Sequence, residues 1–449
     1  MSRETATLAE YAVGLSYDDI PTDVVARAKD CIIDTVAVTT FSSSLPWSRT
    51  VAKYAESTGP GGRSTILGPD RTRVTAPMAA LANGAMAHGF EMDCLRQPSV
   101  GIHAGATVAL PGLAVAEDLG ASGKELVTAF VAGNEVLSRV GLAGQHSSEQ
   151  LGFHAPGLTG PIGSAVIAGR LMGLDAGRMT CAMGIAGSLS SGLLEFIRSG
   201  TGGMVKRLHL GRAAEGGVMA ASLARDGFTG PETVLEGEFG FLNVFCRNPD
   251  PSQLTKGLGA IFETRNICLK RFSCHITAHT PVQAILDLKA EHGFSGDDVE
   301  SITVHGSKKM ATHHDIAEPA DVMLAQYSTR FCVAVAMLKD PLDPTSFMEA
   351  SVEDEAIRDL CRRSRVVERT DEAGKNMPWA TIVDVALRNG RTVTKQADTF
   401  MGMPVDPVSR EDLSAKFMRL TSSMEPDWQN RVRDALFDLE NYGDVSSLL

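Results

Sequence analysis

The chain has 449 residues, which is more than one compact core usually holds, so we expect two domains or one large domain with an insertion. Hydrophobic residues make up 43% and charged residues 21% of it, values of an ordinary globular protein that exclude a disordered chain. A formal net charge of -12 argues against nucleic acid as the main partner, because binding phosphate groups needs a basic surface. An anionic substrate would need a local basic pocket.

The eight cysteines are scattered without a Cys-x-x-Cys pair, so neither a zinc site nor a thioredoxin-like motif is predicted. This pattern favours a reduced, cytoplasmic protein. No apolar run approaches membrane-spanning length, and the first ten residues include Arg3, Glu4 and Glu10 without an apolar segment. We therefore expect neither export nor a membrane anchor.

The first half of the chain reads as a succession of helices separated by glycine, proline and short polar loops. We expect these helices over 7–15, 21–42, 47–57, 75–90, 104–118, 122–142, 160–172, 175–197 and 209–226, with an extended run at 64–67. The stretch 75–90 is rich in alanine and glycine, whose small side chains permit close approach of neighbouring helices.

Strand-like runs appear after residue 268. We expect helices over 280–292, 325–338 and 353–363, a strand over 299–304, and a hairpin of 381–387 with 392–396. The hairpin is the clearest β signal, because Asn389-Gly390 favours a tight two-residue turn. The segment 409–439 is helical again, with Ser409 as its N-cap.

These patterns predict a mainly α fold with an α+β part. We expect a helical domain formed by both chain ends, 1–267 and 399–449, and an inserted α+β domain over 268–398.

One stretch concentrates cations and imidazoles where the pattern changes, and it contains Lys270, Arg271, His275 and His279. Such residues hold carboxylates and move protons, which suits chemistry on a small polycarboxylic acid. The alternative is a basic loop at a domain junction. If this stretch is helical, His275 and His279 share one face, a spacing that also suits a metal, but no third ligand is patterned nearby, so we expect no metal site.

Three earlier loops also have chemical potential. The polar loop 91–98 contains Glu91 and Asp93 and leads to His103, while a Gly-Phe-His-Ala-Pro-Gly loop contains His154. In a third loop, 204–209, Lys206 and His209 precede an expected helix start at 211. Backbone N–H groups there could face an anion, and the helix dipole would add to the lysine charge.

The roles of these side chains follow from their types. His154 is the first choice for a general base, because no aliphatic surroundings explain it as a core residue. His103 is either an ordinary helix cap or a second proton-transfer group, and Asp93 either orients a histidine or caps the following helix. Lys206 and Lys270 either bind a carboxylate or are simply solvated.

Short motifs recur in a fixed order along nearly the whole chain. They are Ile33-Asp34-Thr35, Asn83-Gly84 with Ala87-His88, Leu110-Pro111, Gly133-Asn134-Glu135-Val136, His154-Ala155-Pro156-Gly157, Lys206 to Ala214, Gly227 to Pro231, Lys270-Arg271-Phe272 with His275 and His279, and Ser409 to Phe417. As an ordered set they resemble the MmgE/PrpD family of 2-methylcitrate dehydratases, cis-aconitate decarboxylases and iminodisuccinate epimerases.

The resemblance implies a helical domain, an inserted α+β lid, a homodimer and a cofactor-free site between the domains. Such enzymes eliminate water, decarboxylate or epimerise by proton transfer next to a carboxylate. The chain departs from the family where an Asp-Phe-Asp-Asp-Thr loop is Glu91-Met92-Asp93-Cys94-Leu95 and where relatives often carry a tyrosine, here Phe331. These departures argue against 2-methylcitrate as the substrate.

The sequence thus predicts a cytoplasmic lyase that acts on a di- or tricarboxylate without metal or cofactor. The predicted catalytic residues are His154, His103, Lys206, Lys270 and Asp93, and the predicted substrate-binding residues are Arg271, His275, Glu91 and His209. In this scheme the lysines and Arg271 hold carboxylates, His154 removes or returns the proton, and His103 is the opposite acid or base. Two alternatives stay open: an epimerase of a substituted succinate, and a catalytically silent carboxylate-binding protein.

Overall fold

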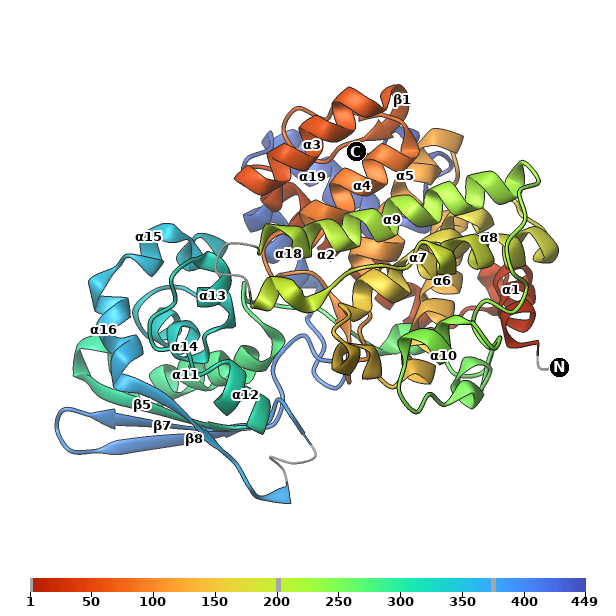
Figure 1. Cartoon of the computed structure of the whole chain (residues 1–449). Coiled ribbons are helices and arrows are strands. Elements are labelled where there is room, and N and C mark those ends of the chain that lie inside the picture. The colour runs from red at the N-terminus through yellow and green to blue at the C-terminus, as the bar shows by residue number, and fades with distance from the viewer. Residues whose placement is uncertain (1–2, 199–202, 373–376) are drawn as a thin grey trace. The chain divides into compact units, whose positions relative to one another are not determined.

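The computed structural model describes residues 3–198, 203–372 and 377–449 (Figure 1). Its contacts group the chain into two compact units: unit 1 is Met1–Leu269 with Ser409–Leu449, and unit 2 is Lys270–Val408. Unit 1 is built almost entirely of helices, whereas unit 2 combines helices with a sheet. The fold is therefore mainly α with an α+β part, as predicted from the sequence. The domain boundaries proposed at 267 and 398 stay predictions.

Unit 1 consists of helices and two small strand pairs. Its described α-helices are α1 (Glu4–Gly14), α2 (Thr22–Ser42), α3 (Pro46–Thr58), α4 (Ala76–Ala87), α5 (Leu110–Leu119), α6 (Gly123–Gly144), α7 (Ala155–Leu171), α8 (Ala176–Ser188), α9 (Met204–Arg225), α10 (Phe241–Phe245), α18 (Arg410–Leu420) and α19 (Pro426–Phe437). The antiparallel strand pairs are β1 (Pro60–Thr65) with β2 (Arg73–Val74) and β3 (Leu95–Arg96) with β4 (Ile267–Cys268). By length and composition α6 could cross a membrane, but nearly all of it is buried in the protein interior.

Unit 2 packs helices against a four-stranded sheet of order β6-β5-β7-β8. Its strands are β5 (Val299–Gly306), β6 (Ser364–Glu368), β7 (Thr381–Leu387) and β8 (Thr392–Ala397), and its described α-helices are α11 (His279–His292), α12 (Lys308–His313), α13 (Val322–Tyr327), α14 (Thr329–Leu338), α15 (Glu349–Val352) and α16 (Glu355–Arg363). β6 runs parallel to β5, and the other neighbours are antiparallel. The β7–β8 hairpin confirms the turn predicted at Asn389-Gly390.

Helix α9 packs against both α4 and α7 in unit 1 (Figure 1). Glycines allow this close approach. A Cβ added to Gly84 of α4 would lie 3.1 Å from both the Ala214 Cβ and the Gly211 Cα of α9, and one added to Gly217 would overlap Ser164 of α7. The expectation that the small residues of 75–90 permit close helix packing is confirmed. Because the three helices are held at short range, side chains at their ends are brought together.

The last segment of the chain belongs to unit 1 and is fixed to its first helices. Ser409 caps α18 as predicted, since its hydroxyl accepts a hydrogen bond from the Asp412 N–H at 3.0 Å. Lys416 of α18 pairs with the buried Asp34 of α2 at 2.5 Å. This ion pair joins residues from opposite ends of the sequence and holds residues 409–449 against the first helices.

Some predicted boundaries are wrong. The helix expected over 175–197 ends at Ser188, and the one expected over 325–338 is two helices, because Ser328 ends α13 and its hydroxyl caps α14. The helices expected from 160 and 209 begin at Ala155 and Met204. β6 lacked a turn signal in the sequence and was missed.

Candidate active site

Three helix termini in unit 1 supply the candidate site. His88 is the residue that ends α4, His154 is the residue that precedes α7, and Lys206 and His209 lie in the first turns of α9. The chain between α4 and the next helical segment, 88–104, carries the remaining groups, Glu91, Asp93 and His103. Because α4, α7 and α9 pack together, these side chains form one group, which we call the imidazole cluster: His88, Asp93, His103, His154 and His209.

Asp93 lies at the centre of the imidazole cluster and is fully buried. Its Oδ2 lies 2.9 Å from Nδ1 of His88 and 2.7 Å from Nδ1 of His103. Burial alone would raise the pKa of the Asp93 carboxyl, but the two imidazoles bound to it hold that pKa well below its usual range. An ionised carboxylate only accepts hydrogen bonds, so both Nδ1 atoms carry the proton and both Nε2 atoms face away from Asp93.

The two histidines held by Asp93 differ in their surroundings. Burial lowers the pKa of His88 to about 4, although Asp93 acts in the opposite direction, so this ring is neutral near pH 7. Its Nε2 is buried and makes no hydrogen bond to the described residues. His103 is more exposed, and its ring meets that of His88 edge-on at a centroid distance of 5.0 Å. Asp93 therefore positions one buried and one accessible imidazole.

A second pair of imidazoles lies beside the first. Nδ1 of His154 is 3.1 Å from Nδ1 of His209, so one ring donates a hydrogen bond and the other accepts it. Burial, together with the positive groups around it, lowers the pKa of His154 well below its ordinary value, and burial also lowers the pKa of His209. The ring of Phe196 packs against both. Both imidazoles are thus kept neutral and suited to accept a proton.

Lys206 forms an ion pair with Glu91, and both side chains are buried. Glu91 has a left-handed backbone with a φ of 55°, which is uncommon for a residue other than glycine and occurs often at functional sites. Next to Lys206, the Nε of Arg207 donates to the carbonyl of Gly89 at 3.0 Å. These contacts fix the turn after α4 against the start of α9 and place an ammonium group beside the imidazoles.

Cys94, the residue after Asp93, fixes the loop 88–104 to its neighbours. The Sγ of Cys94 lies 3.1 Å from that of Cys31 on α2 and accepts the backbone N–H of Gly105 at 3.2 Å. Gly105 begins a π-helical turn, Gly105–Ala109, just after His103, and such turns are frequent at functional sites. Cys94 is therefore a packing residue that joins the loop after Asp93 to α2 and to the backbone after His103.

The remaining predicted residues belong to unit 2. Lys270 is buried, and Nη1 of Arg271 donates to Gln283 Oε1 at 2.8 Å. His275 stacks on His314 with ring centroids 4.4 Å apart. His279 is the first residue of α11, whereas His275 precedes a separate short turn, so the two histidines do not lie on one helix and the condition for a shared face is not met. The roles of Lys270, Arg271 and His275 in binding substrate stay predictions.

Two further expectations change with the structure. The helix start predicted at Gly211 is wrong, because α9 begins at Met204 and Gly211 packs in mid-helix against Leu81. Lys206 and His209 therefore lie on the helix and do not precede it. His88 was missed as a site residue: the pattern placed it inside a helix over 75–90, although the motif Ala87-His88 was a signal for it. Because α4 ends at Ala87, the side chain of His88 lies beyond the helix and points into the site.

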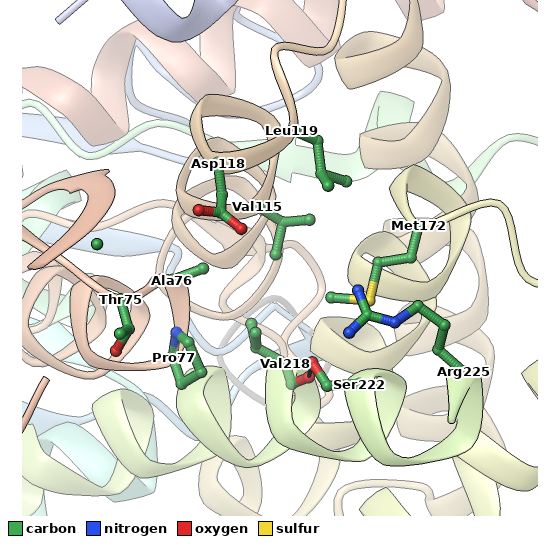
Figure 2. Close-up of a pocket in the computed structure, with 11 residues that line it drawn as sticks. Thr75, Ala76, Pro77, Val115, Asp118, Leu119, Met172, Val218, Ser222 and Arg225 are labelled. Carbon is green, nitrogen blue, oxygen red and sulfur yellow. Dashed lines mark hydrogen bonds between the residues drawn. The ribbon is translucent and has the colours of Figure 1, made fainter. Parts of the chain in front are cut away.

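A separate pocket in unit 1 contains none of these groups (Figure 2). It has a volume of about 170 Å³ and is lined largely by apolar side chains such as Val115, Met172 and Val218, with Asp118 and Arg225 as its ionisable residues. Without a histidine or lysine it lacks a group suited to proton transfer near neutral pH. We therefore place the candidate active site at the imidazole cluster.

Comparison with known proteins covers almost the entire chain. Residues 6–254 match the MmgE/PrpD N-terminal domain and residues 272–439 match the MmgE/PrpD C-terminal domain. The chain is 28% identical to a cis-aconitate decarboxylase of Aspergillus terreus, with 99% of this chain and 95% of the relative covered. It is 27% identical to the human cis-aconitate decarboxylase, with 99% and 94% covered. A cis-aconitate decarboxylase-like protein of Aspergillus oryzae is 28% identical, with 99% and 96% covered. With both of its domains matched in order, the chain belongs to the MmgE/PrpD family.

Proposed function

We propose that this protein, a lyase of the MmgE/PrpD family, is a cofactor-independent decarboxylase of a tricarboxylate of the cis-aconitate type. The observation that carries the proposal is Asp93, a buried carboxylate that holds the imidazoles of His88 and His103 next to the Lys206–Glu91 ion pair. This arrangement combines proton transfer with carboxylate binding. The relatives named cis-aconitate decarboxylase, which match over nearly the full length of the chain, support the choice of reaction.

The reaction requires one proton and releases carbon dioxide. In cis-aconitate the carboxylate on the saturated carbon leaves as carbon dioxide, and the electrons of its C–C bond form a new C=C bond. The electrons of the old double bond then take up a proton at the carbon next to another carboxylate. The product is a five-carbon unsaturated dicarboxylic acid. The enzyme must therefore supply a proton donor and offset the negative charge that develops on the carbon skeleton.

His103 is the proposed proton donor. Its Nδ1 is bound to Asp93, which fixes the orientation of the ring, and this leaves Nε2 to face the substrate and give it a proton. His88 is held by the same carboxylate oxygen but is buried and neutral. We therefore assign His88 to positioning Asp93. Asp93 in turn fixes the orientation of His103.

The carboxylates of the substrate require cations. We propose that Lys206 shares its ammonium group between Glu91 and a substrate carboxylate, while Lys270 and Arg271 bind a second carboxylate. Glu91, His209 and His275 complete the proposed binding residues. Lys206 would act on a charge present in substrate and transition state alike, so its loss should weaken apparent affinity as well as rate.

Incubation of the chelator-treated enzyme with cis-aconitate, citrate, 2-methylcitrate, trans-aconitate and iminodisuccinate, followed by mass spectrometry, tests the proposal. We expect loss of carbon dioxide from cis-aconitate. Loss of water from a hydroxy acid, without decarboxylation, would contradict the proposed reaction. Binding of all five acids without turnover of any would indicate a catalytically silent family member.

An epimerase of a substituted succinate is the second candidate. The observation that favours it is the His154–His209 pair, because two neutral imidazoles, one buried and one partly buried, can remove a proton from carbon. In that case His154 and His103 would act as opposed base and acid. The two candidates differ in their products, since an epimerase changes optical rotation without a change in mass. His154→Gln should then cut turnover by about two to four orders of magnitude.

A further inference from the structure

His88, Asp93 and His103 form a set of possible metal ligands. One ligand atom of each lies within 4.8 Å of the others, and in the described part of the chain no other group of three histidine, cysteine or acidic residues meets this criterion. Two imidazoles and one carboxylate are the ligand types that divalent zinc and its neighbours in the first transition series prefer. A small inward movement of the rings would bring the three atoms to coordinating distance.

The unsatisfied atoms of this set also favour a cation. Nε2 of His88 and Oδ1 of Asp93 are both buried, and neither has a hydrogen-bond partner among the residues that the structure describes. Buried polar atoms without partners are costly, and an ion bound to Asp93 would satisfy Oδ1. Lys206 is the nearby cation that would oppose an ion, but its charge is offset by the ion pair with Glu91. Asp93 therefore contributes a net negative charge at this point.

We propose that His88, Asp93 and His103 bind one divalent transition-metal ion, such as Zn²⁺, and that the bound ion inhibits the enzyme. The inhibitory part rests on the proposed function. A metal bound to Asp93 and to Nδ1 of His103 would displace the Nδ1 proton to solvent and replace the hydrogen bond between His103 and the carboxylate. The enzyme would then be active when free of metal and blocked when loaded.

Metal binding can be measured without reference to activity. Protein freed of metal by a chelator is titrated with Co²⁺, which gives visible absorption bands when bound by nitrogen and oxygen ligands, and then with Zn²⁺ as competitor. We expect one ion per chain, displaced by zinc. X-ray absorption of the zinc-loaded wild type should show nitrogen neighbours at about 2.0–2.1 Å and no sulfur at about 2.3 Å.

Two variants locate the site. His88→Gln should weaken Co²⁺ binding at least tenfold, while His305→Gln should leave it unchanged. His305 is a matched control, because its Nε2 binds Asp384 at 2.9 Å in unit 2. Should His88→Gln fail to fold, the X-ray absorption spectrum of the zinc-loaded wild type still shows whether nitrogen ligands bind the ion. A sulfur shell, or no binding at millimolar cobalt, would overturn the site.

The activity of the same samples separates the two proposals. Zinc should lower turnover of cis-aconitate at least tenfold, and excess chelator should restore it. Turnover that is unchanged with zinc bound overturns the inhibition. Decarboxylation without metal binding overturns the metal site and leaves the proposed function standing. Zinc binding through nitrogen ligands without turnover of any acid supports the site and overturns the proposed function.

Discussion

Asp93 determines the state of two histidines through a single oxygen atom. It accepts Nδ1–H of His88 and of His103, so each ring presents Nε2 away from the carboxylate. An imidazole that is buried without such a partner, like His154, is neutral and poorly suited to donate a proton at neutral pH. His154 thus differs from His103 in its hydrogen-bond partner, which is another imidazole where His103 has a carboxylate.

Replacing Asp93 tests this role. Asp93→Asn keeps the size of the side chain but removes its charge, and its amide can donate to a ring nitrogen, which favours the wrong tautomer. Turnover should fall by about two to four orders of magnitude with little change in KM, as measured by steady-state kinetics. The control is Asp384→Asn, which alters another His–Asp pair outside the candidate site and should leave the rate unchanged.

The buried imidazoles also predict how stability depends on pH. Because the pKa of His154 is lower in the folded protein than its unfolded value of about 6.5, the unfolded state binds more protons below that pH. Stability should therefore be lost as pH falls from about 6.5 towards the folded pKa, by up to about 1.4 kcal/mol per pH unit for one such histidine. Urea unfolding at pH 7.5 and 5.5 measures the loss, and it should be smaller in His154→Asn. An equal loss in both proteins would show that other groups cause it.

Several site residues could be predicted from the sequence because motifs contain them. Asp93 lies in a polar loop that leads to His103, and Lys206 lies in a basic motif. The pairing of His154 with His209 could not be predicted, since the two are 55 positions apart and only the packing of α7 on α9 brings them together. The same holds for the ion pair of Lys206 with Glu91. The sequence shows which residues can do chemistry, but which of them are in contact depends on tertiary packing.

Among the elements, α9 has the greatest influence on the site. Its first turns carry Lys206 and His209, and its glycines let it lie close to α4 and α7. Its early start was not predictable because Gly203, at its N-cap, offers no capping side chain. The β7–β8 hairpin was predictable, because Asn389-Gly390 encodes its turn locally. A local signal thus sufficed for this hairpin and for the Ser409 cap of α18, whereas the start of α9 depends on packing.

Two adjacent glycines of α9 provide a matched test of this packing. In Gly217→Ala the new methyl would overlap Ser164, so the helices must separate, and we expect a loss of about 1–3 kcal/mol in the free energy of unfolding. In Gly216→Ala the nearest atom is 3.7 Å away, and alanine favours a helix, so stability should be unchanged or rise by up to about 1 kcal/mol. Urea denaturation compares them, and similar losses in both variants would refute close packing as the cause.

At the scale of the whole molecule, the chain ends meet in unit 1. Lys29 of α2 pairs with Glu440 at 2.6 Å, and Lys416 pairs with Asp34, so residues 409–449 are fixed to the N-terminal helices. Such long-range pairs were not predictable individually, but the return of helical pattern after 409 was visible in the sequence. The expectation of a helical part made from both chain ends, with an α+β part between them, therefore came from the helical pattern of the sequence and not from any individual contact.

A homodimer formed through unit 1 is the next prediction at this scale. Large apolar side chains are exposed on unit 1, including Phe239, Leu193, Phe228 and Met204, and exposed apolar groups often mark subunit interfaces. Sedimentation at micromolar concentration should give a species of twice the chain mass. A single species of 47.7 kDa would contradict the dimer.

The measurement that tests the account most directly is decarboxylation of cis-aconitate in deuterated water. If His103 donates the proton, the product should have lost one carboxylate as carbon dioxide and should carry a single deuterium on the carbon next to a remaining carboxylate. His103→Gln should form this product at least a hundredfold more slowly while still binding the substrate. Product that forms at the same rate in His103→Gln, or substrate that gains deuterium without losing carbon dioxide, would contradict the account.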